Sequence, residues 1–334
     1  MNASQQVEAS SPSLGEHNLT EPVIVVVGSL NMDLVTVTDH VPDAGETVLG
    51  SSFHTFCGGK GANQAVACAR LGAKVHMIGC IGDDSFGQDL LHNLEAEGID
   101  CSGITIIQGK SSGTAAITIN DHDNRIIVVP GANGEFTATL VEKHRELIQA
   151  ADLLLMQLEV PMETVKAAAF IAQEHRVPIM LNPAPAAPLD AAWMETINWF
   201  TPNEHELSIM LGNQLKLETD SPSAMEHWGA LLGTCPERII MTKGADGALW
   251  TTADGQVQHT KGLNVEVKDT TGAGDTFNGA LAVSLAEGRC LEEAVKRSVA
   301  AGALSVTRFG AQGGMPTRTE LEAFLQTGKI SSSS

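Results

Sequence analysis

Apolar residues follow two different spacings along most of the chain. Short continuous runs such as 23–27 (VIVVV) and 153–158 are typical of strands that are buried on both faces of a sheet. Longer stretches such as 84–97 and 162–176 carry apolar residues at helical spacing instead. Because these two patterns alternate, the sequence predicts an α/β fold in which helices flank a mostly parallel sheet.

The alternation continues to the end of the chain. Further strands are expected at 75–80, 178–181 and 265–268, strand segments from 199 and 238, and a hairpin at 247–260. Further helices are expected up to residue 70 and at 137–149, 191–196, 223–232, 274–287 and 291–307.

Two stretches break the alternation. Residues 34–56 contain short alternating pieces, and 104–129 contain three strand patterns (104–107, 114–119 and 125–129) without a helical one. We expect both stretches to form a small antiparallel sheet that stands off the main body. The predicted organisation is one domain at 22–328, with a lid from about 34–56 and 101–130, between polar tails at 1–21 and 329–334 that are expected to be disordered.

Composition and charge exclude several classes of partner. A formal net charge of −20 opposes binding to nucleic acid or anionic membranes, and no apolar run approaches the length of a membrane span. The six cysteines are scattered without a CxxC pair, and the N-terminus lacks a signal-peptide pattern. These features predict a cytoplasmic protein with reduced thiols, in which an anionic ligand must be bound by local donors.

Polar residues follow most of the predicted strands. They are Asn31, Asp33, Glu159, Asn182, Asn203, Thr242 and Asp275. Taken singly, each could be a helix cap or an Asx turn. Because the carboxyl ends of parallel strands meet at one edge of a sheet, the set as a whole predicts a binding site at that edge.

The stretch 269–280 (DTTGAGDTFNGA) is expected to lead from a strand into a helix. Gly272, Ala273 and Gly274 would leave backbone N–H groups at the helix N-terminus free to face an anion. Asp275 would lie in the first turn. A phosphate-binding turn beside a carboxylate that can take a proton suits phosphoryl transfer to a hydroxyl, although the same residues also fit a glycine-rich loop with a capping Asp.

A second glycine-rich stretch, 57–65 (CGGKGANQA), is expected to open a helix. Its glycines would let the backbone approach a ligand closely, and Lys60 and Asn63 could donate hydrogen bonds to it. Upstream, Asn31 and Asp33 share one strand face, where an amide and a carboxylate could clamp vicinal hydroxyls.

The two glycine-rich motifs, 58–65 and 269–280, resemble the two signatures of the PfkB carbohydrate kinase family, and the resemblance extends over roughly 23–325. With Asn31-Met32-Asp33 upstream, the likeness is to the members that phosphorylate ribose more than to fructokinase or adenosine kinase members. It implies a Rossmann-like domain with a β-sheet lid, a homodimer formed through that lid, and transfer of phosphate from ATP to O5 of D-ribose with Mg²⁺ and an activating K⁺.

The resemblance also implies roles for individual residues. Ribose would be held by Asn31, Asp33, Gly59, Lys60, Gly61, Asn63 and Glu159. Asp275 would take the proton from O5, and the N–H groups of Gly272, Ala273 and Gly274 would form the anion hole. ATP and Mg²⁺ would lie against Asn203, Glu206, Thr242, Lys243, Gly244, Ala245, Asp246, Gly247 and Gly274, with an adenine contact near Val299. K⁺ would be bound mostly by backbone oxygens at Asp269, Thr271, Ser305, Arg308, Gly310 and Gly314.

Three other functions were weighed against this one. Another sugar or nucleoside kinase of the same family, acting for example on deoxyribose or fructose, has the same motifs and stays open. A sugar sensor without catalysis is disfavoured by the intact Asp275, Gly272 and Gly274. A nicotinamide-dependent oxidoreductase is disfavoured because no Gly-x-Gly-x-x-Gly follows the first strand.

Overall fold

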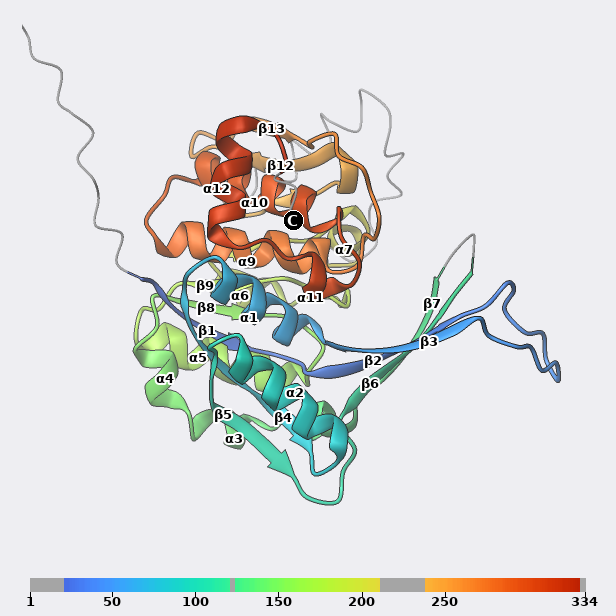
Figure 1. Ribbon diagram of the computed structural model, residues 1–334. Helices are drawn as coiled ribbons and strands as arrows, with labels where there is room; N and C mark the ends of the chain where they lie inside the picture. Colours follow the sequence, from blue (N-terminus) through green and yellow to red (C-terminus); the bar gives the residue numbers. More distant parts are fainter. Residues whose placement is uncertain (1–20, 121–123, 211–237, 331–334) are drawn as a thin grey trace, which may run out of the picture.

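A computed structural model describes residues 21–120, 124–210 and 238–330. The helix expected at 223–232 and nearly all of the two expected tails lie outside these residues. The described chain is built on a six-stranded parallel sheet of order β10-β9-β8-β1-β4-β5, which confirms the predicted fold class (Figure 1). The strands are β1 (Val23–Val27), β4 (Lys74–Gly82), β5 (Asp100–Ile107), β8 (Leu153–Met156), β9 (Ile179–Leu181) and β10 (Trp199–Phe200).

Strand β1 lies at the centre of this sheet because every residue in it is apolar and β-branched. Its side chains alternate between two hydrophobic cores, with Ile24 and Val26 in one and Val25 and Val27 in the other. The first core is covered by α1 (Lys60–Arg70), α2 (Ser85–Ala96), α9 (Ala273–Ala286), α10 (Leu291–Ser305) and α12 (Arg318–Thr327). The second is covered by α3 (Ala138–Glu142), α4 (Arg145–Gln149), α5 (Met162–Glu174), α6 (Ala191–Met194) and α7 (Glu204–Met210).

A four-stranded sheet projects from the body as a long arm (Figure 1). Its strands are β2 (Asn31–Val37), β3 (Ser52–Gly58), β6 (Gly113–Ile119) and β7 (Asn124–Val129), in the order β3-β2-β6-β7. We call this sheet the lid. Because only residues 28–30 separate the end of β1 from the start of β2, the lid grows directly from the carboxyl edge of the central sheet.

The structure corrects two expectations about the lid. The strand expected at 104–107 is the end of β5 and pairs in parallel with β4, so it belongs to the central sheet. The lid is also mixed, because β2 and β6 run parallel while the other two pairings are antiparallel. β5 is an edge strand in which only Gly103 is buried, and its mixture of apolar and polar residues resembles that of a lid strand.

Two further expectations were wrong in detail. The helix expected at 137–149 is two helices, α3 and α4, because the chain turns at Lys143 and His144. The segment 265–268 is not a strand; the N–H groups of Lys268 and Asp269 donate to the Val306 carbonyl at 2.8 and 3.3 Å.

The remaining elements are a small sheet in the upper part of the molecule in Figure 1 and several short helices. A three-stranded antiparallel sheet contains β11 (Met241–Thr242), β12 (Gly247–Thr251) and β13 (Val257–Lys261), and the short helices are η1 (Gly131–Glu135), η2 (Gly244–Asp246) and α11 (Ala311–Gly314). Two isolated parallel bridges, Phe200–Ile239 and Asn203–Thr242, continue the central sheet toward β11. None of the described helices is long and apolar enough to cross a membrane.

We expect Gly279→Ala to destabilise the protein by about 1–3 kcal/mol, because overpacking a tight core contact costs that much. Gly279 lies where α9 meets α1, and a Cβ at this position would come within 2.4 Å of the Ala67 Cβ. Urea denaturation measures the loss. Gly134→Ala is the control, because a Cβ there would make only an ordinary contact, at 3.5 Å from Pro130. Equal stability of the Gly279 variant and the wild type would contradict the prediction.

Candidate active site

The candidate site forms where the loop after β1, the start of α1 and the start of α9 meet. The glycines of 58–65 allow this meeting, but the close approach is to the chain's own backbone. A Cβ on Gly61 would lie 2.6 Å from the Ser29 nitrogen, and one on Gly59, which has φ +88°, would lie 2.7 Å from the Asn31 nitrogen. These two glycines therefore seat α1 against the loop that carries Asn31, rather than making room for a ligand.

Glu159, which follows β8, gathers three groups from the other side of the site. Its Oε2 accepts hydrogen bonds from the Ser29 hydroxyl at 2.6 Å, the Lys60 backbone N–H at 3.1 Å and the Asn31 side-chain amide at 3.4 Å. The predicted residues Asn31, Lys60 and Glu159 are thus brought together. Ser29 was missed by the sequence analysis, because a serine in a loop after a strand carries no distinctive spacing.

Asn133 in η1 is a second residue that the sequence analysis missed. Its Oδ1 accepts from the Leu30 N–H at 3.0 Å, and its Nδ2 donates to the Leu30 carbonyl at 2.9 Å and to Asn31 Oδ1 at 2.8 Å. Asn133 therefore fixes the Asn31 amide with its N–H₂ group toward Glu159. The contact joins residues 102 apart in the sequence, so no local pattern could have revealed it.

Asp33 lies close to two other carboxylates. Burial, together with the negative charges of Glu159 and Asp275, raises the pKa of Asp33 to about 7. Asp33 packs closely beneath Gly58, where a Cβ would lie 2.5 Å from one of its carboxylate oxygens. The predicted pair Asn31 and Asp33 thus lies at the root of the lid, beside the carboxylates of the main body.

Asp275, in the first turn of α9, is buried with 8 % of its surface exposed. Its Oδ2 accepts from Asn63 Nδ2 at 2.9 Å and its Oδ1 from Gln64 Nε2 at 3.0 Å, so both donors come from α1. Burial raises the pKa of Asp275, while the nearby Lys60 ammonium and these two hydrogen bonds oppose the shift. Gln64 was not among the predicted site residues, although it directly follows Asn63.

Lys60 supplies the positive charge of this cluster. Burial acts to lower the pKa of Lys60, but the charges of Asp275, Glu159 and Glu206 outweigh it and hold the pKa above its ordinary value. The ammonium therefore stays charged among these three carboxylates, each carried by a different element of the fold.

Asn203 and Glu206 form a reciprocal cap at the start of α7. The Glu206 N–H donates to Asn203 Oδ1 and the Asn203 N–H donates to Glu206 Oε2, both at 2.8 Å. Burial raises the pKa of Glu206, and Lys60 acts against that shift. Among the residues that the structure describes, no three His, Cys, Asp or Glu side chains are grouped to hold a metal ion.

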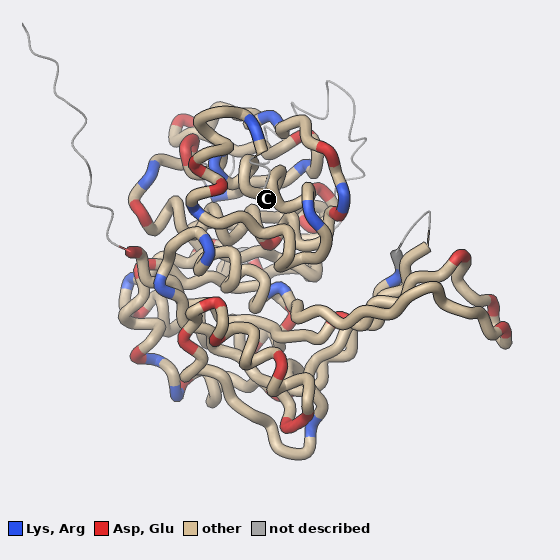
Figure 2. The backbone as a smooth tube through the Cα atoms, in the orientation of Figure 1, with Lys and Arg blue, Asp and Glu red and all other residues tan. Residues whose placement is uncertain are grey.

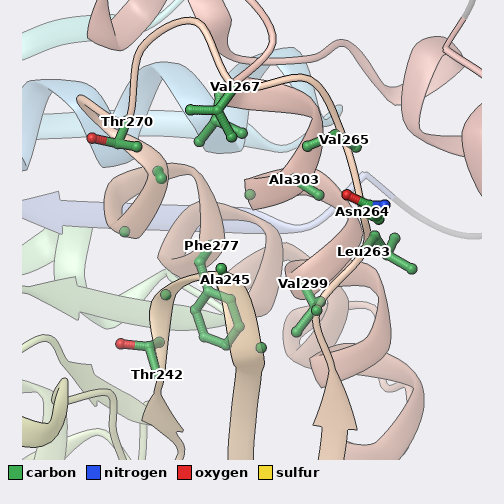
Figure 3. A pocket seen from close by; sticks show the side chains of 17 residues that line it. Thr242, Ala245, Leu263, Asn264, Val265, Val267, Thr270, Phe277, Val299 and Ala303 are labelled. Carbon is green, nitrogen blue, oxygen red and sulfur yellow. The ribbon is translucent and has the colours of Figure 1, made fainter.

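A cavity of about 570 Å³ lies beside the start of α9 (Figure 3). Its walls are largely apolar, and the labelled side chains that carry polar atoms are those of Thr242, Asn264 and Thr270 (Figure 3). Of the residues predicted to contact a nucleotide, Thr242, Gly244, Ala245, Gly247, Gly274 and Val299 line it, whereas Asn203, Glu206, Lys243 and Asp246 do not. Sequence reasoning did not assign to the site the wall formed by Gly262, Leu263, Asn264, Val265 and Val267, which was expected only as the approach to the α9 turn.

The predicted anion-binding turn opens toward this cavity. Gly272 is left-handed, with φ +76°, and a Cβ there would lie 2.8 Å from the Ala311 Cα and Cβ. Ala273 and Gly274 line the cavity, although the Ala273 N–H also donates to the Thr270 carbonyl in a long 3.3 Å bond. Asp275 directly follows Gly274, so the start of α9 lies between the cavity and the carboxylates of Asp33, Glu159 and Asp275.

The six positions expected to bind a monovalent cation are close to one another. The Asp269 carboxylate accepts from the Thr271 N–H at 2.9 Å and hydroxyl at 2.7 Å, and from the Gly310 N–H at 2.8 Å. A Cβ on Gly314 would lie 2.2 Å from the Ser305 carbonyl oxygen. The fold therefore brings the 269–271 loop next to the 305–314 segment.

Comparison with known proteins agrees with this arrangement. The model of the pfkB family carbohydrate kinases matches residues 22–318. The chain belongs to the pfkB family of carbohydrate kinases. A ribokinase of Bacillus subtilis is 45 % identical over 302 residues, which cover 90 % of this chain and 99 % of that protein. A deoxyribokinase of Salmonella typhi is 37 % identical over 304 residues, covering 90 % and 98 % of the two chains.

A solved pfkB-like structure extends the likeness to the fold. The structure of an Arabidopsis thaliana ribokinase complexed with ribose and ATP matches with a TM-score of 0.84 at 28 % identity, over 92 % of this chain and 99 % of that one. The family expected from the two glycine-rich motifs is therefore confirmed, and with it the assignment of the chain as a carbohydrate kinase.

We expect Asp33 to make this pfkB-family protein less stable as the pH rises. The folded pKa of Asp33, about 7, lies above the ordinary 3.8, so its protonated form contributes stability at low pH that is lost as the pH rises through 7. Asp33→Asn should therefore gain stability over the wild type by roughly 2–4 kcal/mol between pH 4 and pH 8, since one pKa unit corresponds to about 1.4 kcal/mol.

Urea denaturation across this pH range measures the difference. Asp39→Asn, which changes an exposed carboxylate of the lid, is the control and should show little pH-dependent difference from the wild type. A constant offset between the Asp33 variant and the wild type at all pH values would contradict the prediction.

Proposed function

We propose that the protein transfers the γ-phosphoryl group of ATP to O5 of D-ribose, giving ribose 5-phosphate. The observation that carries this proposal is the place of Asp275. Its buried carboxylate lies between a cluster of sugar-binding type, made of amides and carboxylates, and a largely apolar cavity that opens at a helix N-terminus. The similarity to ribokinases, at 45 % identity in Bacillus subtilis and in a structure holding ribose and ATP, supports this choice of substrates.

The sugar is proposed to bind among Asn31, Asp33, Asn63 and Glu159, with Gly59, Lys60 and Gly61 completing the pocket. Carboxylates accept hydrogen bonds from hydroxyl groups and amides can both donate and accept, so this set suits a polyol. Hydroxyl donors would also reduce the mutual repulsion of Asp33, Glu159 and Asp275. A neutral ligand rich in hydroxyl groups therefore matches a site with an excess of carboxylates.

The reacting end of the sugar is proposed to lie against Asp275. O5 attacks the γ-phosphorus, the bond from that phosphorus to the β–γ bridging oxygen breaks, and the O5 proton passes to Asp275. Because phosphoryl transfer has a loose transition state, the proton leaves late and a carboxylate of modest basicity suffices. The N–H groups at the start of α9, with the Lys60 ammonium, would stabilise the charge on the transferred group.

ATP is proposed to lie in the cavity beside α9, with its base among residues such as Ala245, Phe277 and Val299 (Figure 3). Mg²⁺ usually binds through one or two carboxylates together with substrate phosphates and water. Glu206, with the Asn203 cap behind it, fits that requirement without a preformed cluster of acidic ligands. When bound, the ion would neutralise phosphate charge.

A monovalent cation, K⁺, is proposed at the junction of the 269–271 loop and the 305–314 segment. Such an ion would be bound by backbone oxygens, because the charged side chains here already have partners. The Asp269 carboxylate accepts from N–H and hydroxyl donors, and Arg308 is paired with Glu320. Backbone oxygens near Thr271, Ser305, Gly310 and Gly314 are the proposed ligands, although the Gly310 carbonyl also accepts from the Gly314 N–H at 3.0 Å. A cation here would stiffen the support of the anion-binding turn.

Deoxyribose is the second candidate substrate. It is favoured by the similarity to the Salmonella typhi deoxyribokinase, at 37 % identity over nearly the whole of both chains. The two sugars differ by one hydroxyl group, so the motifs shared by both enzymes do not separate them.

Release of ADP from ATP and Mg²⁺, measured with ribose, deoxyribose, fructose and adenosine in K⁺ or Na⁺, tests the proposal. We expect the highest kcat/KM with ribose and a higher rate in K⁺. Preference for another acceptor would overturn the proposed substrate, and equal rates in both salts would overturn the proposed cation.

Two variants test the site residues. Asp275→Ala should lose turnover while still binding ribose, and Asp33→Ala should weaken ribose binding strongly. Full turnover of the Asp275 variant would overturn its role as the base.

We also propose that the lid pairs with the lid of a second copy of this chain. Strand register places Asp33, Val35, Ala115 and Ile117 on one lid face, and their neighbours on this face include the exposed apolar residues Phe56, Ile126 and Val128. Charged positions are sparse along the arm except at its acidic tip (Figure 2). The opposite face mixes four threonines, Thr36, Thr55, Thr114 and Thr118, with the exposed apolar residues Phe53, Ile127 and Val129. A second lid would cover the apolar face.

The molar mass in solution, from light scattering after size exclusion, tests this pairing. The wild type should be a dimer, and Ile126→Asp combined with Val128→Asp should be a monomer, since two charges would enter the apolar face. Ile127→Asp is the matched control, because this 69 % exposed residue lies between the two on the opposite face. A monomeric wild type, or dissociation of only the Ile127 variant, would contradict the proposal.

A further inference from the structure

Each oxygen of Asp275 lies at the end of a chain of side-chain amides. In the first chain, Gln157 Nε2 donates to Gln64 Oε1 at 2.6 Å, and Gln64 Nε2 donates to Asp275 Oδ1 at 3.0 Å. Gln64 and Gln157 are both fully buried. This chain connects α9 to α1 and to the loop after β8.

The second chain approaches Asp275 from α2 and α11. Asn93 Nδ2 donates to Gln312 Oε1 at 2.9 Å, and Gln312 Nε2 donates to Asn63 Oδ1 at 3.0 Å. Asn63 Nδ2 then donates to Asp275 Oδ2 at 2.9 Å. In both chains each amide donates toward the carboxylate, and every amide after the first accepts from the one behind it; Gln64 Nε2 also donates to Asn182 Oδ1 at 3.1 Å.

The direction of these chains follows from the charge of Asp275. An ionised carboxylate can only accept hydrogen bonds, so Asn63 and Gln64 must turn their N–H₂ groups toward it. Their oxygens then face away from Asp275. Gln312 and Gln157 must in turn present donors to those oxygens, so the orientation of four amides is set by one negative charge.

At the far end of the first chain, a side-chain oxygen of Gln157 is left without a hydrogen bond. Gln157 Oε1 is buried and has no hydrogen-bond partner among the described residues. It points toward Gly28, where a Cβ would lie only 2.1 Å away. A buried acceptor without a partner is destabilising. If the Gln157 amide were turned round, Gln64 Oε1 would lose its hydrogen-bond donor. The unpaired Gln157 oxygen is therefore the free-energy cost of keeping this chain of amides directed at Asp275.

We propose that Gln64 and Gln312 are positioning residues, which hold Asp275 in one orientation and favour its ionised form. This role rests on the function proposed above, in which Asp275 takes a proton. Each carboxylate oxygen receives one amide donor from α1 and keeps further lone-pair capacity for a substrate hydroxyl. Gln64 contacts the base directly and is held by Gln157, whereas Gln312 acts through Asn63.

The charged groups that face Asp275 come from four other elements. They are Lys60 at the start of α1, Glu159 after β8, Asp33 on β2 and Glu206 on α7. Lys60 favours the ionised form of Asp275, and the three carboxylates oppose it. None of these groups belongs to the amide chains, so removing a chain leaves their charges in place and isolates the contribution of the amides.

The test uses Gln64→Leu combined with Gln157→Leu, which removes both partners of one buried hydrogen bond, and separately Gln312→Met. The titration of Asp275 is followed by ¹³C NMR of labelled aspartate carboxyl groups in the protein without substrates, and its signal is assigned by its absence in Asp275→Asn. In the double variant we expect the midpoint to rise by about one pH unit, because the carboxylate loses one of two amide donors.

Kinetics with ribose give the second readout. In the double variant kcat should fall roughly tenfold to a hundredfold, the cost of a misplaced catalytic group. The acidic limb of its pH profile should move upward with the NMR midpoint, and the KM for ribose should stay near the wild-type value, since Asn31, Asp33 and Glu159 are untouched. Gln312→Met should raise the KM as well, because Asn63 loses its orientation.

Thr164→Val is the matched control. The Thr164 hydroxyl donates to the Phe136 carbonyl, so this variant also loses a buried hydrogen bond, but in α5 and away from Asp275. It should lower the melting temperature without moving the Asp275 midpoint. An unmoved midpoint in both chain variants, with activity lost only in proportion to the folded fraction, would overturn the proposal.

The two proposals fail in different ways. If the wild type does not phosphorylate ribose, the proposed function fails, but the NMR titration still decides whether the amides set the charge state of Asp275. If the double variant does not fold, the Asp275 midpoint in Gln312→Met decides whether the amides act on the carboxylate. This variant is expected to fold, because Gln312 lies at the edge of the core with 9 % exposure.

Discussion

The contact on which the rest of the structure depends is that between the buried Asp275 carboxylate and the start of α1. A carboxylate removed from water is strongly unfavourable unless hydrogen bonds and an opposite charge compensate. Asn63 and Gln64 supply the hydrogen bonds and Lys60 supplies the charge. All three come from one helix, so α1 and α9 cannot move apart without exposing a buried charge to an apolar surrounding.

This contact explains why small residues are concentrated where they are. α9 can begin at Ala273, two residues before Asp275, because Gly272 takes a left-handed conformation against Ala311. It packs closely against α1 because Gly279 leaves room for Ala67. On the other side, Gly61 seats α1 against the loop after β1. The glycines of both motifs thus serve one geometric requirement, which is to bring two helix N-termini and one strand end within reach of the same small volume.

The site also carries more negative charge than it can neutralise. Lys60 is shared among Asp275, Glu159 and Glu206, and Asp33 is left with a pKa of about 7 because burial and two carboxylates disfavour its charge. Such an arrangement lowers the stability of the protein without substrate, as is common where function sets the residues. It also gives a ligand with several hydroxyl groups a specific advantage, because each hydroxyl can donate to a carboxylate that otherwise lacks a sufficient partner.

The sequence predicted the strands and site residues that follow a local spacing of apolar and polar positions. It did not predict the residues whose role depends on contacts with distant parts of the chain. The VIVVV run identified the central strand, and the polar residues after successive strands identified the edge where Asn31, Glu159 and Asp275 meet. It could not identify Asn133 or Gln312, whose partners lie 102 and 249 residues away and whose amides have no characteristic spacing. β5 was misplaced for a related reason, since an edge strand with one buried residue and a lid strand contain similar mixtures of apolar and polar residues.

The course of β2 connects the chemistry of the site to the lid. Asn31 and Asp33 begin this strand, and Val35 continues the Asp33 face outward onto the apolar surface shared with Ile117. Because successive side chains alternate strictly, a shift of one residue in the pairing of β2 with β3 or β6 would turn Asp33 away from Glu159 and the apolar face away from any partner. One strand register therefore fixes both features, and whatever covers the lid face also constrains the carboxylate at its root.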